Sequence, residues 1–208
     1  AEYDRCIQNV REHIRNGDTY QVNLTYRFRS VTSFDPWRLF LQIAGDGEAP
    51  FAGYIDTGEW VVCSASPELF LRIDGDRVES RPMKGTAPRG LWAEDDQAKK
   101  ADLERSEKDR AENVMIVDMV RNDLGRVADV GTVGVPSLVT VEKYPTVWQL
   151  TSTVVAQIRA PLDRLLQATF PPASITGAPK RRTMEIIAGL ESTPRRVYTG
   201  TIGFVSPG

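Results

Sequence analysis

Residues 51–81, FAGYIDTGEWVVCSASPELFLRIDGDRVESR, contain two β-hairpin signals in succession. Runs rich in Val, Ile, Tyr and Phe are interrupted at residues 57–58 and 74–76 by short turn sequences that contain glycine, which is the pattern of paired antiparallel strands. The four strands are predicted at Phe51–Asp56, Glu59–Ala65, Leu69–Ile73 and Arg77–Arg81. Because a hairpin joins neighbouring antiparallel strands, this stretch predicts an antiparallel sheet.

The segments on either side add helices and strands in an order that does not alternate as in a doubly wound fold. Helical spacing, caps and prolines predict helices at residues 3–14, 35–41, 106–125, 162–168 and 179–190. Alternating and Val- or Thr-rich runs predict further strands at Tyr20–Phe28, Val127–Val141, Thr146–Ile158 and Val197–Val205. Residues 45–50 are predicted to form a loop, and the charged residues 91–102 a solvated segment. The sequence therefore predicts a mixed α+β fold, with mostly antiparallel sheets packed with helices.

The overall composition excludes several classes of function. The chain of 208 residues has 26 Lys and Arg against 28 Asp and Glu, so it lacks the basic field that non-specific nucleic-acid binding needs. It contains no run of about 18 apolar residues that could span a bilayer. His13 is the only histidine, which removes most histidine-centred metal sites. We expect a cytoplasmic protein with neither a nucleic-acid nor a membrane partner.

The helix predicted at residues 106–125 has apolar residues on nearly every side and is expected to be buried. Two of its carboxylates, Glu112 and Asp118, would be costly in such a place unless a cation or hydrogen bonds compensate them. A divalent metal would serve. An ion pair of Glu112 with Lys108, and of Asp118 with a nearby arginine, would serve as well.

The segment Ser174–Lys180 is a turn of small residues that runs into a helix, with Pro179 suited to the first helical position. Free N–H groups at the helix start would lie beside Lys180 and the hydroxyl of Thr176, an arrangement that binds carboxylate or phosphate. An ordinary loop with a capped helix accounts for the same pattern. The residues alone leave both interpretations open.

Lys84 lies between an apolar neighbour and a Gly-Thr turn. A partly buried lysine can have its pKa lowered enough to act as a nucleophile, whereas a surface lysine in a loop is the commoner explanation. Glu68 follows Ser66-Pro67 and could merely favour the first turn of a short helix.

Together these segments resemble the chorismate-utilising enzymes, the family of anthranilate, aminodeoxychorismate, isochorismate and salicylate synthases. The resemblance extends over nearly the whole chain and is carried by ordered motifs. These are Gly17–Asn23, Ser66–Glu68, Lys84–Thr86 with Pro88–Gly90, Glu112–Gly125 and Ile175–Lys180. The family pattern also has amino-terminal strands and a carboxy-terminal part with further ligands, so residues 1–208 are expected to be a chorismate-binding catalytic domain truncated at both ends.

The resemblance assigns roles to the residues singled out above. Chorismate is a dicarboxylate bound with Mg²⁺, and Glu112 matches a metal-binding carboxylate. Thr176, Gly177 and Lys180 match the region that binds the substrate, as do Thr86 and Gln149, although many relatives have histidine in place of Gln149. Glu68 matches the general acid that protonates the departing C4 hydroxyl.

Lys84 distinguishes among the members of the family. Aminodeoxychorismate synthases carry a lysine at this place, which is thought to add to C2 of chorismate before ammonia attacks C4, whereas the other members have alanine. The resemblance therefore implies amination at C4 in p-aminobenzoate and folate synthesis, with ammonia from a glutamine amidotransferase partner. The alternatives are an anthranilate synthase component, or a catalytically incomplete fragment that binds chorismate.

Overall fold

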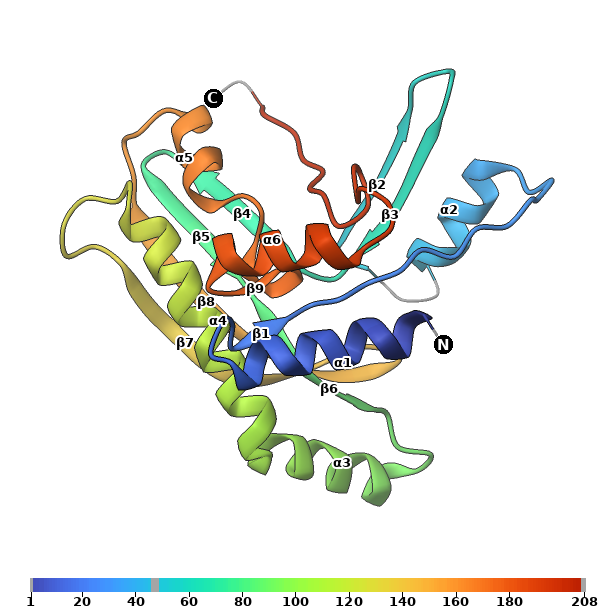
Figure 1. Cartoon of the computed structure of the whole chain (residues 1–208), viewed down its shortest axis with the longest axis horizontal. Helices are drawn as coiled ribbons and strands as arrows, with labels where there is room; N and C mark the ends of the chain where they lie inside the picture. Colours follow the sequence, from blue (N-terminus) through green and yellow to red (C-terminus); the bar gives the residue numbers. More distant parts are fainter. Residues whose placement is uncertain (1, 46–48, 207–208) are drawn as a thin grey trace. The chain divides into compact units, whose positions relative to one another are not determined.

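A computed structural model describes residues 2–45 and 49–206. The chain divides into two compact units, the first made of residues 1–30 and 169–201 and the second of residues 31–168 and 202–208. Both combine helices with antiparallel strand pairs (Figure 1), so the predicted α+β class is confirmed. Residues 46–48 of the predicted loop lie outside the described residues.

The second unit is built on a five-stranded antiparallel sheet with one long strand at its centre. Its members are β4 (Leu69–Asp74), β5 (Arg77–Arg81), β6 (Met83–Pro88), β7 (Gly134–Lys143) and β8 (Val147–Gln157). One edge of β8 pairs first with β6 and then with β5, and the other edge pairs with β7. Three of the other four strands, β5, β6 and β7, therefore pair directly with β8, which is eleven residues long.

A separate hairpin in this unit pairs β2 (Phe51–Asp56) with β3 (Val61–Ser66), and helix α2 (Pro36–Gly45) packs against β3. The helix begins as predicted, because the side chain of Asp35 accepts a hydrogen bond from the backbone N–H of Arg38 at 2.8 Å. The pairing of β4 with β5 confirms the second predicted hairpin.

Helices α3 (Ala93–Arg105) and α4 (Glu107–Gly125) pack against the large sheet, and α5 (Leu162–Thr169) follows β8 (Figure 1). The core between α4 and the sheet contains Val117, Leu124 and Val154, all nearly inaccessible to solvent. The expected burial of α4 holds for one face only, since Ile116 and Leu124 are buried whereas Val114 is 45% exposed. A single face of the helix is enough to cover the sheet.

Residues 91–102 were expected to be a solvated segment; residues 91–94 are indeed exposed, but the segment is helical, because α3 begins at Ala93. Three acidic residues stand in its first turn, where negative charge is favoured by the helix dipole. Leu103 packs into a second core cluster with Trp148 and Leu150. Tertiary contacts thus order a helix whose sequence has little amphipathic pattern.

The first unit contains α1 (Glu2–Arg15), the short strands β1 (Gln21–Val22) and β9 (Gly177–Ala178), the 3₁₀ turn η1 (Ala173–Ile175) and α6 (Lys180–Leu190). β1 and β9 pair antiparallel. The strand predicted at Tyr20–Phe28 is therefore reduced to two residues, and Phe28 is 87% exposed. The strand predicted at residues 197–205 is not formed. A strand needs a partner edge for its backbone hydrogen bonds, and alternation of side chains does not supply one.

Candidate active site

Lys84 lies in a β-bulge where β6 pairs with β8. Met83 is opposite Thr151 and Thr86 is opposite Gln149, so β6 advances three residues while β8 advances two. The extra residue falls at Lys84 and Gly85, and Gly85 has a φ of +95°. Bulges bend a strand and redirect its side chains, and they are common next to active sites.

Glycine at position 85 is required by both backbone and packing. A Cβ atom there would lie 2.8 Å from Leu150 Cδ1 and 2.9 Å from Asp109 Cβ, closer than carbon atoms approach without strain. The Gly-Thr pair that follows Lys84 thus belongs to a closely packed strand, and the alternative of a lysine in a surface loop was wrong. Lys84 itself is half-buried.

Asn113 of α4 fixes the main chain at the bulge. Its Nδ2 donates to the carbonyl oxygens of Lys84 and Leu150, each at 3.2 Å. Its Oδ1 accepts from the hydroxyl of Ser152 at 2.6 Å. Asn113 is 1% exposed and follows Glu112 directly, so the backbones of Lys84 and Glu112 are held in one neighbourhood.

Thr86 and Gln149, two residues assigned to substrate binding, are brought together on paired strands. The Thr86 hydroxyl donates to Gln149 Oε1 at 2.7 Å. On the other side of Gln149, β7 presents Glu142 as its paired residue, and Glu142 forms an ion pair with Arg81. The amide oxygen of Gln149 is therefore engaged by a hydroxyl from the strand of Lys84.

Glu68 lies in the short connection between β3 and β4. Its backbone N–H donates to Ser66 Oγ at 3.3 Å, and its carbonyl oxygen accepts from the same hydroxyl. No helix begins here, so the alternative of a first-turn carboxylate was wrong. Leu69, the next residue, is opposite Arg81, which places Glu68 at the end of the β4–β5 pair from which the chain enters β6 and reaches Lys84.

Glu112 and Asp118 of α4 form the ion pairs that the sequence offered as an alternative to a bound metal. Lys108 Nζ lies 3.9 Å from Glu112 Oε1, and Arg121 lies 2.8 Å from Asp118. The Asp118 side chain is 75% exposed, so it belongs to a solvated face. The long contact of Glu112 with an exposed lysine is weak and leaves the carboxylate able to exchange partners.

Within residues 2–45 and 49–206, no group of three or more His, Cys, Asp or Glu side chains could hold a metal ion. Mg²⁺ in enzymes often takes one or two carboxylates and completes its octahedral shell with water and substrate oxygens. A single half-buried carboxylate such as Glu112 is compatible with that mode of binding.

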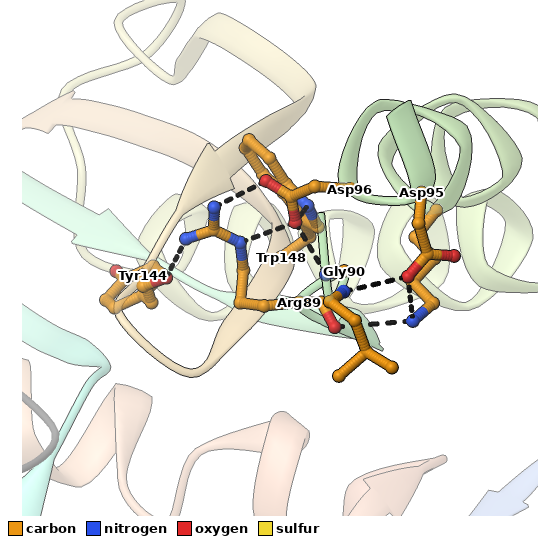
Figure 2. Close-up of polar contacts among 8 residues, drawn as sticks. Arg89, Gly90, Asp95, Asp96, Tyr144 and Trp148 are labelled. Atoms are coloured by element: carbon orange, nitrogen blue, oxygen red, sulfur yellow. Dashed lines mark hydrogen bonds and ion pairs between the residues drawn. The ribbon is translucent and has the colours of Figure 1, made fainter. Parts of the chain in front are cut away.

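Beyond Lys84, a partly buried ion pair between Arg89 and Asp96 anchors the far end of β6 (Figure 2). Arg89 Nε donates to Asp96 Oδ1 at 2.8 Å, and the same oxygen accepts from the backbone N–H of Gly90 at 2.8 Å and from Trp148 Nε1 at 2.9 Å. The guanidinium stacks over the Trp148 ring at 4.7 Å and donates to the carbonyl of Tyr144 at 3.0 Å. The hydrogen bonds from Arg89 hold the pKa of Asp96 well below its usual range, against the opposing effect of burial. Sequence reasoning missed Asp96 and Trp148, because partners from separate elements leave no local pattern.

Thr176, Gly177 and Lys180 lie in the first unit, at the turn between η1 and α6. The Thr176 hydroxyl donates to the carbonyl of Pro172 at 2.9 Å, and Lys180 Nζ donates to the carbonyl of Thr169 at 3.1 Å. Gly177 has a φ of +139°, and a Cβ there would lie 2.0 Å from the carbonyl oxygen of Gln21. The helix begins at Lys180, one residue later than expected.

β6 and α4, which contact each other at Lys84 and Asn113, contain two of the chorismate motifs, and the comparison with known families agrees. The model of the family described as chorismate binding enzyme matches residues 1–208. The chain therefore belongs to the chorismate binding enzyme family, which confirms the resemblance read from its motifs.

Sequence and structure comparisons with individual proteins show how similar this chain is to particular members of the family. Aminodeoxychorismate synthase component 1 of Escherichia coli (strain K12) is 45% identical over 207 residues, which are 99% of this chain and 46% of that protein. Aminodeoxychorismate synthase of Streptomyces griseus is 47% identical over 207 residues, covering 98% of this chain and 29% of that protein. Among solved structures, anthranilate synthase component I of Streptococcus pneumoniae TIGR4 matches with a TM-score of 0.83 at 30% identity, over 92% of this chain and 42% of that one.

The chain thus spans less than half the length of each of these relatives. The assignment of residues 1–208 to one catalytic domain stays a prediction. None of the helices among the described residues is long and apolar enough to cross a lipid bilayer.

Proposed function

We propose that this chain is the part of an aminodeoxychorismate synthase that carries the nucleophilic lysine, and that the intact enzyme aminates chorismate at C4. The observation that carries the proposal is the half-buried Lys84 in a bulge whose neighbours are fixed by Gly85 and Asn113. A fixed backbone at Lys84 sets the point from which its side chain extends, and a positioned nucleophile has a lower entropic cost of reaction. The names of the two aminodeoxychorismate synthase relatives support the same assignment.

The proposed reaction has two steps, and its atoms and bonds balance over the two. The amine of Lys84 adds to C2 of chorismate and loses a proton, both ring double bonds shift by one position, and the C4 hydroxyl leaves as water with a proton from Glu68. Ammonia then attacks C4 and loses a proton, both double bonds shift back, and the bond from Lys84 Nζ to C2 breaks as the lysine nitrogen regains a proton. The sum is chorismate plus ammonia giving 4-amino-4-deoxychorismate plus water. Covalent catalysis of this kind divides one difficult displacement into two easier ones.

Two further groups belong to the proposal. Glu112 would supply one carboxylate to Mg²⁺, and the ion when bound would neutralise carboxylate charge on the substrate. Thr176, Gly177, Lys180, Thr86 and Gln149 keep the substrate-binding roles predicted from the motifs. A glutamine amidotransferase partner as the ammonia source, a cytoplasmic location and a place in p-aminobenzoate and folate synthesis are part of the same proposal.

Replacement of the nucleophile tests the proposal directly. Lys84→Ala in the intact protein, assayed with chorismate, Mg²⁺ and ammonium, should lose or greatly slow formation of the C4-aminated product. Lys143→Ala is the matched control, because Lys143 is an exposed lysine at the end of β7, and it should keep wild-type activity. Product formation by Lys84→Ala at the wild-type rate would refute the role of the lysine. A wild-type product aminated at C2 would instead indicate an anthranilate synthase.

A further inference from the structure

A second bulge lies across β8 from the bulge of Lys84. Ser137 is opposite Thr153 and Thr140 is opposite Thr151, so β7 also carries one residue more than its partner. At this bulge Val139 has a φ of +53°, in the left-handed region that β-branched residues avoid. Backbone strain of this kind persists only where the surroundings impose it, and it is concentrated near functional sites.

The strained backbone is tied to Ser152. The N–H of Val139 donates to Ser152 Oγ at 2.9 Å, and Ser152 is 1% exposed. Because this oxygen accepts from a backbone N–H, its own hydrogen is directed elsewhere, and it is donated to Asn113 Oδ1 at 2.6 Å. The backbone N–H of Ser152 donates to the carbonyl of Pro82 at 3.1 Å, so the same residue also holds the entry to β6.

The bond from Ser152 determines the orientation of the Asn113 amide. With Oδ1 directed at the hydroxyl, Nδ2 faces β6 and β8 and donates to the carbonyls of Lys84 and Leu150. A continuous series of hydrogen bonds therefore runs from the Val139 N–H through Ser152 and Asn113 to the carbonyl of Lys84. The backbone N–H of Val139 and the amide nitrogen of Asn113 can only donate, so the direction of donation along the series is fixed.

The last bond in the series constrains the residue proposed as the nucleophile. The peptide unit is planar, so fixing the carbonyl of Lys84 sets its ψ angle and, with it, the direction of the bond from Cα to the side chain. An apolar residue at position 113 could pack α4 on the sheet, but it could not hold this carbonyl. Buried polar networks that are fully satisfied specify one local structure in this way.

We propose that Asn113 and Ser152 are positioning residues for Lys84, holding the bulge so that the lysine amine meets C2 of chorismate. This inference rests on the proposed function. Neither side chain needs to touch the substrate, and their effect should fall on the covalent step, since a displacement of about 1 Å can slow a reaction about 100-fold. Chorismate binding should change little.

The test separates the covalent step from binding. The intact protein is mixed with chorismate and Mg²⁺ without ammonium, and the adduct on Lys84, chorismate less water, is followed by mass spectrometry of the protein. Ser152→Ala removes one hydroxyl, Asn113→Ala removes the whole amide, and circular dichroism of each variant checks that it is folded. Both should form the adduct about 100-fold more slowly than wild type, with little change in the Kd for chorismate measured calorimetrically.

Ser80→Ala is the control, because Ser80 is a buried serine of β5 in the same sheet and outside the series. It should form the adduct at the wild-type rate. If Ser152→Ala forms the adduct as fast as wild type, the positioning role is refuted while the function of Lys84 stands. If the wild-type protein forms no adduct on Lys84, both the proposed function and this inference are overturned.

Discussion

Gly85→Ala should destabilise the protein more than any change of backbone preference alone can explain. The substitution places a methyl group where φ is +95°, 2.8 Å from Leu150 Cδ1 and 2.9 Å from Asp109 Cβ. Leu150 is fully buried, so it has no free space to move into. The new methyl group must therefore displace either the leucine or the bulge itself.

The magnitude follows from two contributions. Forcing an L-residue into a positive φ costs about 1–2 kcal/mol, and overpacking a well-filled core costs about 1–3 kcal/mol more. We expect a loss of about 2–5 kcal/mol in the free energy of unfolding. Gly75→Ala isolates the first contribution, because Gly75 has a φ of +55° and nothing within 4 Å of the added Cβ. It should cost about 1–2 kcal/mol.

Urea unfolding of the intact protein, followed by circular dichroism, measures both values under one set of conditions. Gly125→Ala provides a second reference, since Gly125 ends α4 without a positive φ and with open space around it. That variant should be neutral or more stable, because alanine favours helix. Equal losses for Gly85→Ala and Gly75→Ala would refute the packing contribution and leave the bulge tolerant of a side chain.

Gly90→Ala should disrupt the joint between β6 and α3, because its Cβ would lie 2.1 Å from the backbone N of Asp96, and a lowered melting temperature by calorimetry checks it. Asp96→Asn should weaken the protein at pH 7. The carboxyl pKa is depressed in the folded state, so its stabilising effect is present above the unfolded value of about 4 and is lost as pH falls through the folded pKa. The stability difference from wild type should narrow below about pH 4, and a difference independent of pH from 7 to about 3 would contradict the assignment. Thr86→Val should leave the melting temperature nearly unchanged, since Thr86 is exposed. The KM for chorismate should rise, because Gln149 loses its hydroxyl donor. An unaltered KM would argue against a role of Thr86 and Gln149 in substrate binding.

Local signals in the sequence were sufficient for the hairpins and most helices. The turns at residues 57–58 and 74–76 contain glycines with positive φ, so the chain must reverse there whatever surrounds it. The motif around Lys84 likewise identified a residue whose neighbours are tightly constrained. Where a single residue type satisfies a local conformation, the sequence alone carries the information.

The errors share a physical cause, because each depended on partners distant in the chain. Tyr20–Phe28 alternates like a strand, yet only Gln21 and Val22 find a paired backbone. The charged segment before α4 becomes a helix because Leu103 reaches a core cluster and Asp96 reaches Arg89 and Trp148. Nothing in the sequence near Asn113 reveals that its amide meets strands 29 and 37 residues away.

The central place of β8 has a consequence for synthesis on the ribosome. Of the strands in this sheet, β4, β5 and β6 are translated first, and β4 can pair with β5 at once. The edges of β5 and β6 that pair with β8 remain open until α3, α4, β7 and then β8 have been translated. Until then, exposed strand edges can pair with other nascent chains. Productive folding of this unit should therefore wait for residues 147–157, and chains that stall before them should be the ones that chaperones retain.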